Sequence, residues 1–161
     1  MPIPARSTIS SASAGPDVLR ELYGRVLVPR AVLTELLHAE APPEVRAWAS
    51  ALPAWLEATE VRQLDTGLPA GLGRGEREAI SLALEVCADV LLIDERAGRR
   101  EAEARHIAVA GTLAVLLQAS LRGYLDLPEA MKQLRRYGFR ASPPIEASML
   151  ARYEQAKKVK P

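Results

Sequence analysis

Residues Gly73 to Arg96, which read GRGEREAISLALEVCADVLLIDER, decide the fold of this chain. A glycine and an acidic turn precede apolar residues at helical spacing up to Cys87, a pattern that predicts a buried helix. The run from Val90 to Asp94 is apolar until its final carboxylate, which is typical of a strand in a parallel sheet covered on both faces. We therefore expect Asp94 at the carboxyl end of a strand, the edge of an open α/β sheet where ligands bind.

The rest of the chain predicts helices that alternate with short strands. Helices are expected over residues 18–23, 30–37, 42–49, 97–105, 113–121, 127–137 and 142–156, and further strands over 26–28, 55–58 and 106–110. This alternation favours an α/β fold with a parallel sheet between layers of helices. Residues 1–16 are rich in Ser, Ala and Pro, so we expect a divergent, disordered N-terminal tail before a domain over residues 17–161.

Composition narrows the class of protein. The 161 residues, of which 48% are hydrophobic, suit one domain with a real core. The net charge of +1 means that any contact with nucleic acid must come from local clusters of basic residues. The single cysteine, Cys87, excludes an internal disulfide, is expected to be buried in its helix, and fits the reducing cytoplasm. No apolar run of about 18 residues occurs, so we expect no membrane span.

Several short motifs follow Pro16 in a fixed order. They are Asp17–Gly24, Val26–Pro29 with Ala31-Val32 and Glu35-Leu36, Gly75-Glu76 with Glu78–Ile80, Leu92–Arg96, Gly111–Leu113, and Leu134 with Gly138–Arg140. None is specific alone, but their order and spacing together resemble the PIN-domain nucleases, in particular a prokaryotic subfamily of VapC-like toxins. The resemblance implies a three-layer α/β/α fold with a short parallel sheet, and the activity of a ribonuclease.

The resemblance also implies a metal site. Carboxylates at the carboxyl edge of the sheet hold Mg²⁺ or Mn²⁺ in that family, and the matching residues here are Glu35, Glu76 and Asp94. Glu78 is a further candidate ligand, because the related flap endonucleases use two acids with this spacing. Hard divalent cations prefer carboxylate and water oxygens, which explains the residue type. Helix-dipole contacts for Glu76 and Glu78, a turn position for Asp94 and a solvated helix flank for Glu35 are the structural alternatives.

Basic residues crowd the segment just after Asp94. We expect Arg96, Arg99 and Arg100 to contact the phosphates of RNA, which position a nucleic acid without reading its sequence. The alternative is a solvated helix face with Arg–Glu pairs. Thr112 either caps its own helix or lines the site, as its position in the family suggests.

The start of the chain departs from the family pattern. Family members open with an apolar strand that ends in an Asp, the first metal ligand, whereas residues 1–16 contain no acid. We expect this first strand to be missing or degenerate, and Asp17 to cap the next helix instead. A decayed or frameshifted gene, a misassigned start, or an atypical strand over Ser7 to Ser11 would each account for the departure.

These observations lead to two hypotheses of function. The first is a cytoplasmic, metal-dependent ribonuclease of the PIN type, the toxin of a type II toxin–antitoxin system, with activity impaired by the lost acid. Its partners are an RNA substrate, a cognate antitoxin and a second copy in a homodimer, but no membrane. The alternative is a degenerate PIN domain without catalysis that acts as a protein-interaction module, with the apolar helix over residues 113–121 as a candidate surface.

Overall fold

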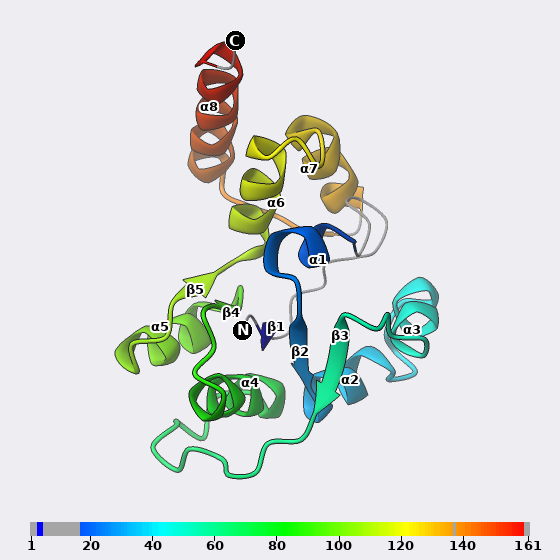
Figure 1. Cartoon of the computed structure of the whole chain (residues 1–161), viewed down its shortest axis with the longest axis vertical. Helices are drawn as coiled ribbons and strands as arrows, with labels where there is room; N and C mark the ends of the chain where they lie inside the picture. Colours follow the sequence, from blue (N-terminus) through cyan, green and yellow to red (C-terminus); the bar gives the residue numbers. More distant parts are fainter. Residues whose placement is uncertain (1–2, 5–16, 137, 160–161) are drawn as a thin grey trace.

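Short parallel strands lie at the centre of the molecule and are surrounded by helices (Figure 1). The computed structural model describes residues 3–4, 17–136 and 138–159. The strands are β1 (Ile3–Pro4), β2 (Val26–Pro29), β3 (Leu56–Thr59), β4 (Leu91–Leu92) and β5 (Val109–Ala110). The helices are α1 (Asp17–Tyr23), α2 (Arg30–Leu36), α3 (Pro43–Ala49), α4 (Arg74–Glu85), α5 (Arg96–Ala104), α6 (Thr112–Leu121), α7 (Leu127–Arg136) and α8 (Pro143–Val159).

All strand pairs of the described residues are parallel. One sheet has the order β1-β4-β5, with Ile3 opposite Leu91 and Leu91 opposite Val109. The other pairs β2 with β3, with Val26 opposite Leu56. β1 also contacts β2, so the N-terminal strand lies between the two sheets. Parallel neighbours need crossover connections, and α4 and α5 supply them on either side of β4 in the chain.

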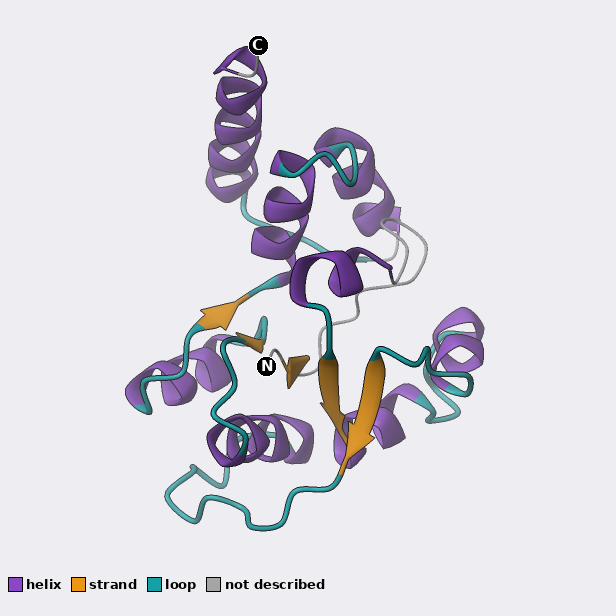
Figure 2. Cartoon of the chain, in the orientation of Figure 1, coloured by secondary structure: helices purple, strands orange, loops and turns teal. Residues whose placement is uncertain are grey.

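The strands carry apolar residues on both faces, which places them in the middle of three layers. Leu27 and Leu91 pack in a core cluster with α4, whereas Val28 and Leu92 pack in another with α1 and α6. Figure 2 shows these helices on opposite sides of the strands. Residues that alternate between two cores produce the unbroken apolar runs read in the sequence. The three-layer α/β/α class expected from the sequence is therefore confirmed.

A third core cluster joins α6, α7 and α8. Leu116 and Leu117 of α6 meet Leu134 of α7 and Met149 and Tyr153 of α8. Most of the apolar helix α6 is buried between this cluster and the strands, because Val115 packs in the sheet-side cluster. α6 therefore connects the α/β layers to the C-terminal helices.

A strand occurs near the start of the chain, where the sequence predicts a missing or degenerate one. β1 is described over Ile3 and Pro4, the residues on either side lie outside the described part of the chain, and residues 1–16 contain no acid. The alternative strand over Ser7 to Ser11 and the expected disorder of the tail fall on residues outside those described, apart from Ile3 and Pro4. No helix in the described part of the chain has the length and apolarity needed to cross a membrane.

Two predictions about helix ends were wrong. Cys87 is exposed and lies beyond the end of α4, with φ of 48°, and His106 does not begin a strand but ends α5 with φ of 59°. In each case the next amide bonds the carbonyl five residues back, Ala88 N to Ala83 O at 2.9 Å and Ile107 N to Ala102 O at 3.0 Å. Both are left-handed helix ends of a kind that usually carries glycine, and because neither position is a glycine, the sequence pattern did not mark these ends.

Candidate functional site

Asp94 follows β4 and is bound by one residue of α6. Its Oδ1 accepts a hydrogen bond from the Thr112 backbone N–H at 2.8 Å, and its Oδ2 accepts one from Thr112 Oγ1 at 2.5 Å. Thr112 is the first residue of α6 and is buried, so the carboxylate lies at the positive end of that helix. Of the two expectations for Thr112, the contact of its hydroxyl with Asp94 agrees with a place at the site, and the N-cap position of α6 is held by Gly111.

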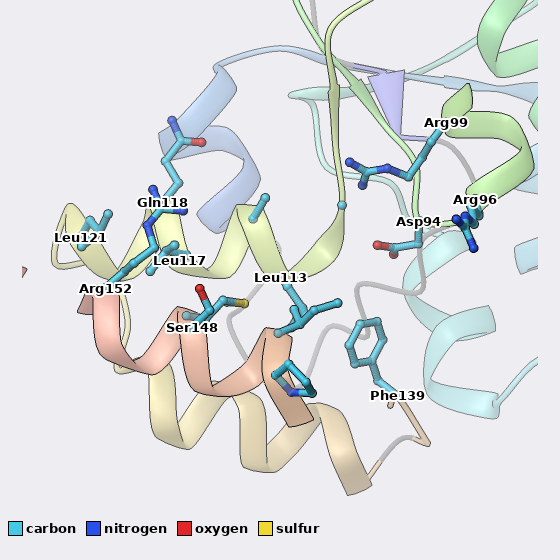
Figure 3. A pocket seen from close by; sticks show the side chains of 15 residues that line it. Asp94, Arg96, Arg99, Leu113, Leu117, Gln118, Leu121, Phe139, Ser148 and Arg152 are labelled. Carbon is cyan, nitrogen blue, oxygen red and sulfur yellow. The ribbon is translucent and has the colours of Figure 1, made fainter. Parts of the chain in front are cut away.

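Arg99 lies on the same side of Gly111 as Asp94. A Cβ atom at Gly111 would lie 2.7 Å from Asp94 Oδ1 and 2.9 Å from Arg99 Nη1, so only glycine leaves room for both groups. Arg99 Nη1 also donates to the Ile93 carbonyl at 3.3 Å. The guanidinium is therefore held near the Asp94 carboxylate, as Figure 3 shows.

Asp94 opens into a pocket of about 930 Å³ that it shares with Arg96 and Arg99 (Figure 3). Arg96 is the first residue of α5 and is exposed. Arg100 is also exposed but does not line this pocket. The structure thus brings two of the three predicted RNA-binding arginines to Asp94 and leaves the third on the outer face of α5.

The Arg–Glu pairing offered as an alternative for this segment involves a different arginine. Arg105 donates to Glu101 Oε2 at 2.8 Å and to Asp65 Oδ2 at 2.5 Å. Both acceptors raise the pKa of Arg105, with Asp65 the larger cause. Arg105 therefore ties α5 to the loop before α4, and it takes no part in the pocket.

Glu76 lies at the start of α4 and is 3% exposed. Its Oε2 accepts a hydrogen bond from the Gly73 backbone N–H at 2.8 Å, which satisfies an amide that the helix itself cannot pair. A Cβ atom at Gly98 would lie 2.8 Å from Glu76 Oε1, so the carboxylate extends from α4 to α5. Glu76 thus lies in the first turn of α4, as the helix-dipole alternative expects, where it accepts the Gly73 N–H, and it also faces the helix that carries Arg96 and Arg99.

Glu78 points elsewhere. Its Oε2 accepts from the Ala31 backbone N–H at 2.9 Å, and its Oε1 accepts from Arg74 Nε at 3.0 Å. Two residues apart on a helix, the side chains of Glu76 and Glu78 diverge by about 200°. Glu78 therefore binds the first turn of α2, and the structure does not bring it to Asp94.

Glu35 is half-buried on α2 and lies against the first turn of α4. A Cβ atom at Gly75 would be 3.1 Å from Glu35 Oε1 and 3.3 Å from Oε2. Gly75 directly precedes Glu76 in the chain. The structure thus brings Glu35 to the beginning of the helix that carries Glu76.

Comparison with protein families agrees with this geometry. A family model described as PIN domain matches residues 14–155. The chain belongs to the PIN-domain family. No curated protein and no solved structure gives a significant match. Membership of the PIN family indicates a nuclease-type function and RNA binding, and members of the family generally use divalent metal ions.

The carboxylates of this PIN domain fit a divalent ion in kind. Glu35, Glu76 and Asp94 offer the oxygen donors that Mg²⁺ and Mn²⁺ prefer. Each carboxylate lies close to a glycine whose missing side chain leaves room for it: Gly75 beside Glu35, Gly98 beside Glu76 and Gly111 beside Asp94. In the described residues, however, no three side chains of His, Cys, Asp or Glu lie close enough together to hold a metal ion. The three carboxylates that match the family are therefore present, but they do not form one cluster in the described residues.

Sequence reasoning missed the C-terminal residues that line the pocket in this PIN domain. Phe139 follows α7, and Ile145, Met149 and Arg152 lie on α8. The only local signal was Gly138, which predicts the end of a helix but not where the next residue points. The contact between these segments and the sheet edge depends on long-range packing.

Proposed function

We propose that this PIN domain is a metal-dependent ribonuclease whose reactive centre lies at Asp94. The observation that carries the proposal is the pocket in which a carboxylate at the end of a parallel strand lies beside Arg96 and Arg99. Arginines bind phosphate oxygens in a planar, charge-assisted geometry. A carboxylate and two guanidinium groups in one pocket suit the phosphodiester of a nucleic acid.

The proposal gives each residue a separate task. Glu35, Glu76 and Asp94 are the carboxylates available for a divalent ion. Because they do not form one cluster in the described residues, they would have to draw closer together to hold it, and the ion would then supply an activated water and neutralise charge on the phosphate. Thr112 orients Asp94 through two hydrogen bonds. Arg99, fixed by the Ile93 carbonyl, would bind the phosphate next to Asp94. Glu78 is excluded from this set, because both its oxygens accept hydrogen bonds at the start of α2.

The biological setting belongs to the same proposal. The resemblance to VapC-like toxins supports a type II toxin that acts in the cytoplasm and is silenced by a small antitoxin over the acidic edge. A homodimer is part of this proposal as well. Its surface would not be the whole of α6, since six of the ten residues of that helix are buried within the monomer.

The absence of acids from residues 1–16 keeps a second function open. Without the first-strand Asp, the site has less negative charge to hold a cation, and loss of one ligand commonly abolishes metal binding. The alternative proposal is a degenerate PIN domain that has kept its surface for a protein partner and does not cut RNA.

Calorimetric titration with Mn²⁺ separates the two proposals. The wild-type protein should bind Mn²⁺ and cleave RNA in its presence, and Asp94→Asn and Glu76→Gln should each weaken both processes. Glu103→Gln is the matched control, because Glu103 is an exposed acid on α5 outside the site. A folded wild type that binds no Mn²⁺ would reject the ribonuclease proposal and favour the interaction module.

A further inference from the structure

The pocket beside Asp94 continues into an apolar groove between α6 and α8. Leu113, Leu117 and Leu121 recur every four residues on α6 and so form one wall along about 12 Å of helix. Ile145 and Met149 of α8 form the facing wall. A groove with such walls suits the flat faces of aromatic or heterocyclic rings.

Phe139 stands at the end of this groove nearest Asp94, as Figure 3 shows. Its position is set by the end of α7, where the Gly138 N–H bonds Arg135 O at 3.0 Å and the Phe139 N–H bonds Leu134 O at 3.1 Å. Gly138 has φ of 84°, which glycine adopts without strain and other residues rarely adopt. The half-buried ring also packs on the α6–α8 cluster. It is therefore a fixed aromatic surface and not a free side chain.

Cations lie at both ends of the groove. Arg96 and Arg99 lie beside Asp94, and Arg152 of α8 lies at the other end (Figure 3). Among the ion pairs of residues 17–136 and 138–159, none involves these three arginines. Positive groups that flank an apolar surface complement a chain whose phosphates alternate with flat bases.

We propose that this groove is a nucleobase subsite, in which an unpaired base stacks on Phe139 while the arginines bind the neighbouring phosphates. The proposal deepens the ribonuclease function proposed above and rests on it, since Asp94 lines the same pocket and the substrate must enter there. A base within a duplex is already stacked and paired. The subsite therefore selects single-stranded RNA, whose bases are free to turn outward.

Binding measurements test the subsite without any need for catalysis. A short fluorescent RNA is titrated in EDTA, as a single strand and annealed to its complement, and its anisotropy is followed. Phe139→Ala should weaken single-strand binding roughly 5- to 100-fold, the range for loss of one base–aromatic stack, and leave duplex binding unchanged. Phe139→Trp should retain single-strand binding. Tyr124→Ala is the matched control, because Tyr124 is 45% exposed and lies outside the groove.

A second variant guards against a loss of fold. Ile145 is 52% exposed, so Ile145→Glu places an acid in the groove with little cost to the core, and it too should weaken single-strand binding about tenfold or more. If Phe139→Ala and Ile145→Glu both bind single strands like the wild type, the subsite is wrong. Absence of RNA binding by the wild type also rejects it, and then favours an acidic protein segment as occupant.

The subsite and the nuclease can fail separately. RNA that binds through Phe139 but stays intact with Mn²⁺ would support the subsite and reject the ribonuclease. The converse result is RNA cleavage that depends on Mn²⁺ and Asp94, while Phe139→Ala and Ile145→Glu change neither single-strand binding nor cleavage. That result would support the ribonuclease and reject the subsite.

Discussion

Thr112 contributes to the orientation of Asp94, because both oxygens of the carboxylate accept hydrogen bonds from it. The backbone N–H would remain whatever side chain stood at position 112, whereas only Ser or Thr supplies the hydroxyl. A substitution at position 112 can therefore remove the hydroxyl bond to Asp94 while it keeps the backbone bond at the start of α6. Gly111 adds a steric condition, since any side chain there would meet Asp94 and Arg99.

Thr112→Val should lower both stability and RNA cleavage. Valine keeps the shape of threonine but removes one hydrogen bond to a charged group, which costs about 1.5 kcal/mol in the free energy of unfolding. Cleavage should fall further than stability alone explains, because Asp94 loses the contact that orients it. Urea unfolding and RNA cleavage measure the two effects. Thr112→Ser should restore both, and a Thr112→Val protein with full cleavage would contradict the role given to the hydroxyl.

Packing between α2 and α4 depends on another carboxylate, Glu78. Its bond to the Ala31 N–H pairs an amide at the start of α2 that the helix leaves without a partner. Glu78 is 7% exposed, so removal of its carboxylate leaves that amide poorly solvated. The residue thus positions the helix that carries Glu35.

Glu78→Ala should reduce the free energy of unfolding by about 1–3 kcal/mol, the cost of a buried donor left unsatisfied. Urea unfolding measures the loss, and Glu154→Ala, an exposed position on α8, is the control with little expected effect. At temperatures where Glu78→Ala and the wild type are both folded, Glu78→Ala should reduce the Mn²⁺ affinity much less than Asp94→Asn does. An equal loss of Mn²⁺ affinity would instead make Glu78 a metal ligand.

An ion pair that depends on pH, between Arg105 and Asp65, is one of the contacts that hold the loop between β3 and α4; amides of the loop also bond Ser81 and Glu85 of α4. The hydrogen bond from Arg105, and after it the bond from the Gly67 N–H, lower the pKa of Asp65. A carboxylate with a lowered folded-state pKa adds stability above its unfolded pKa of roughly 4 and loses it as the pH falls through the folded value.

The loop should therefore loosen in acid and remain docked at neutral pH. Pepsin should cut within residues 60–73 faster as the pH falls below about 4, relative to a peptide standard measured at each pH. Asp65→Asn should be cut quickly across that whole range, because the amide cannot form the ion pair. Equal, pH-independent protection of the wild type and of Asp65→Asn would show that the ion pair does not hold the loop.

The order of helices and strands could be predicted from the sequence, because apolar periodicity reports which residues face a core. The ends of α4 and α5 could not, since Cys87 and His106 adopt left-handed conformations that composition does not mark. Asp94 was predicted as a site residue from its place after an apolar strand, and the structure adds its contact with Thr112. Phe139 was noted only as part of a family motif, and its place in the pocket was not predicted, because it depends on packing among α6, α7 and α8.

At the scale of the whole molecule, the pocket joins two parts with separate cores. Asp94 and Arg99 belong to the α/β layers, whereas Phe139 and Arg152 belong to the C-terminal helices. α6 contributes to both cores and carries Thr112 at its start. A bound RNA would contact both parts at once, so the packing of α7 and α8 on α6 affects substrate binding as well as stability.

The whole site also depends on the strand at the start of the chain. β1 pairs in parallel with β4, so the two strands end at the same edge of the sheet. Asp94 lies two residues after Leu92, so the pairing of Pro4 with Leu92 supports the strand end from which the Asp94 carboxylate enters the pocket.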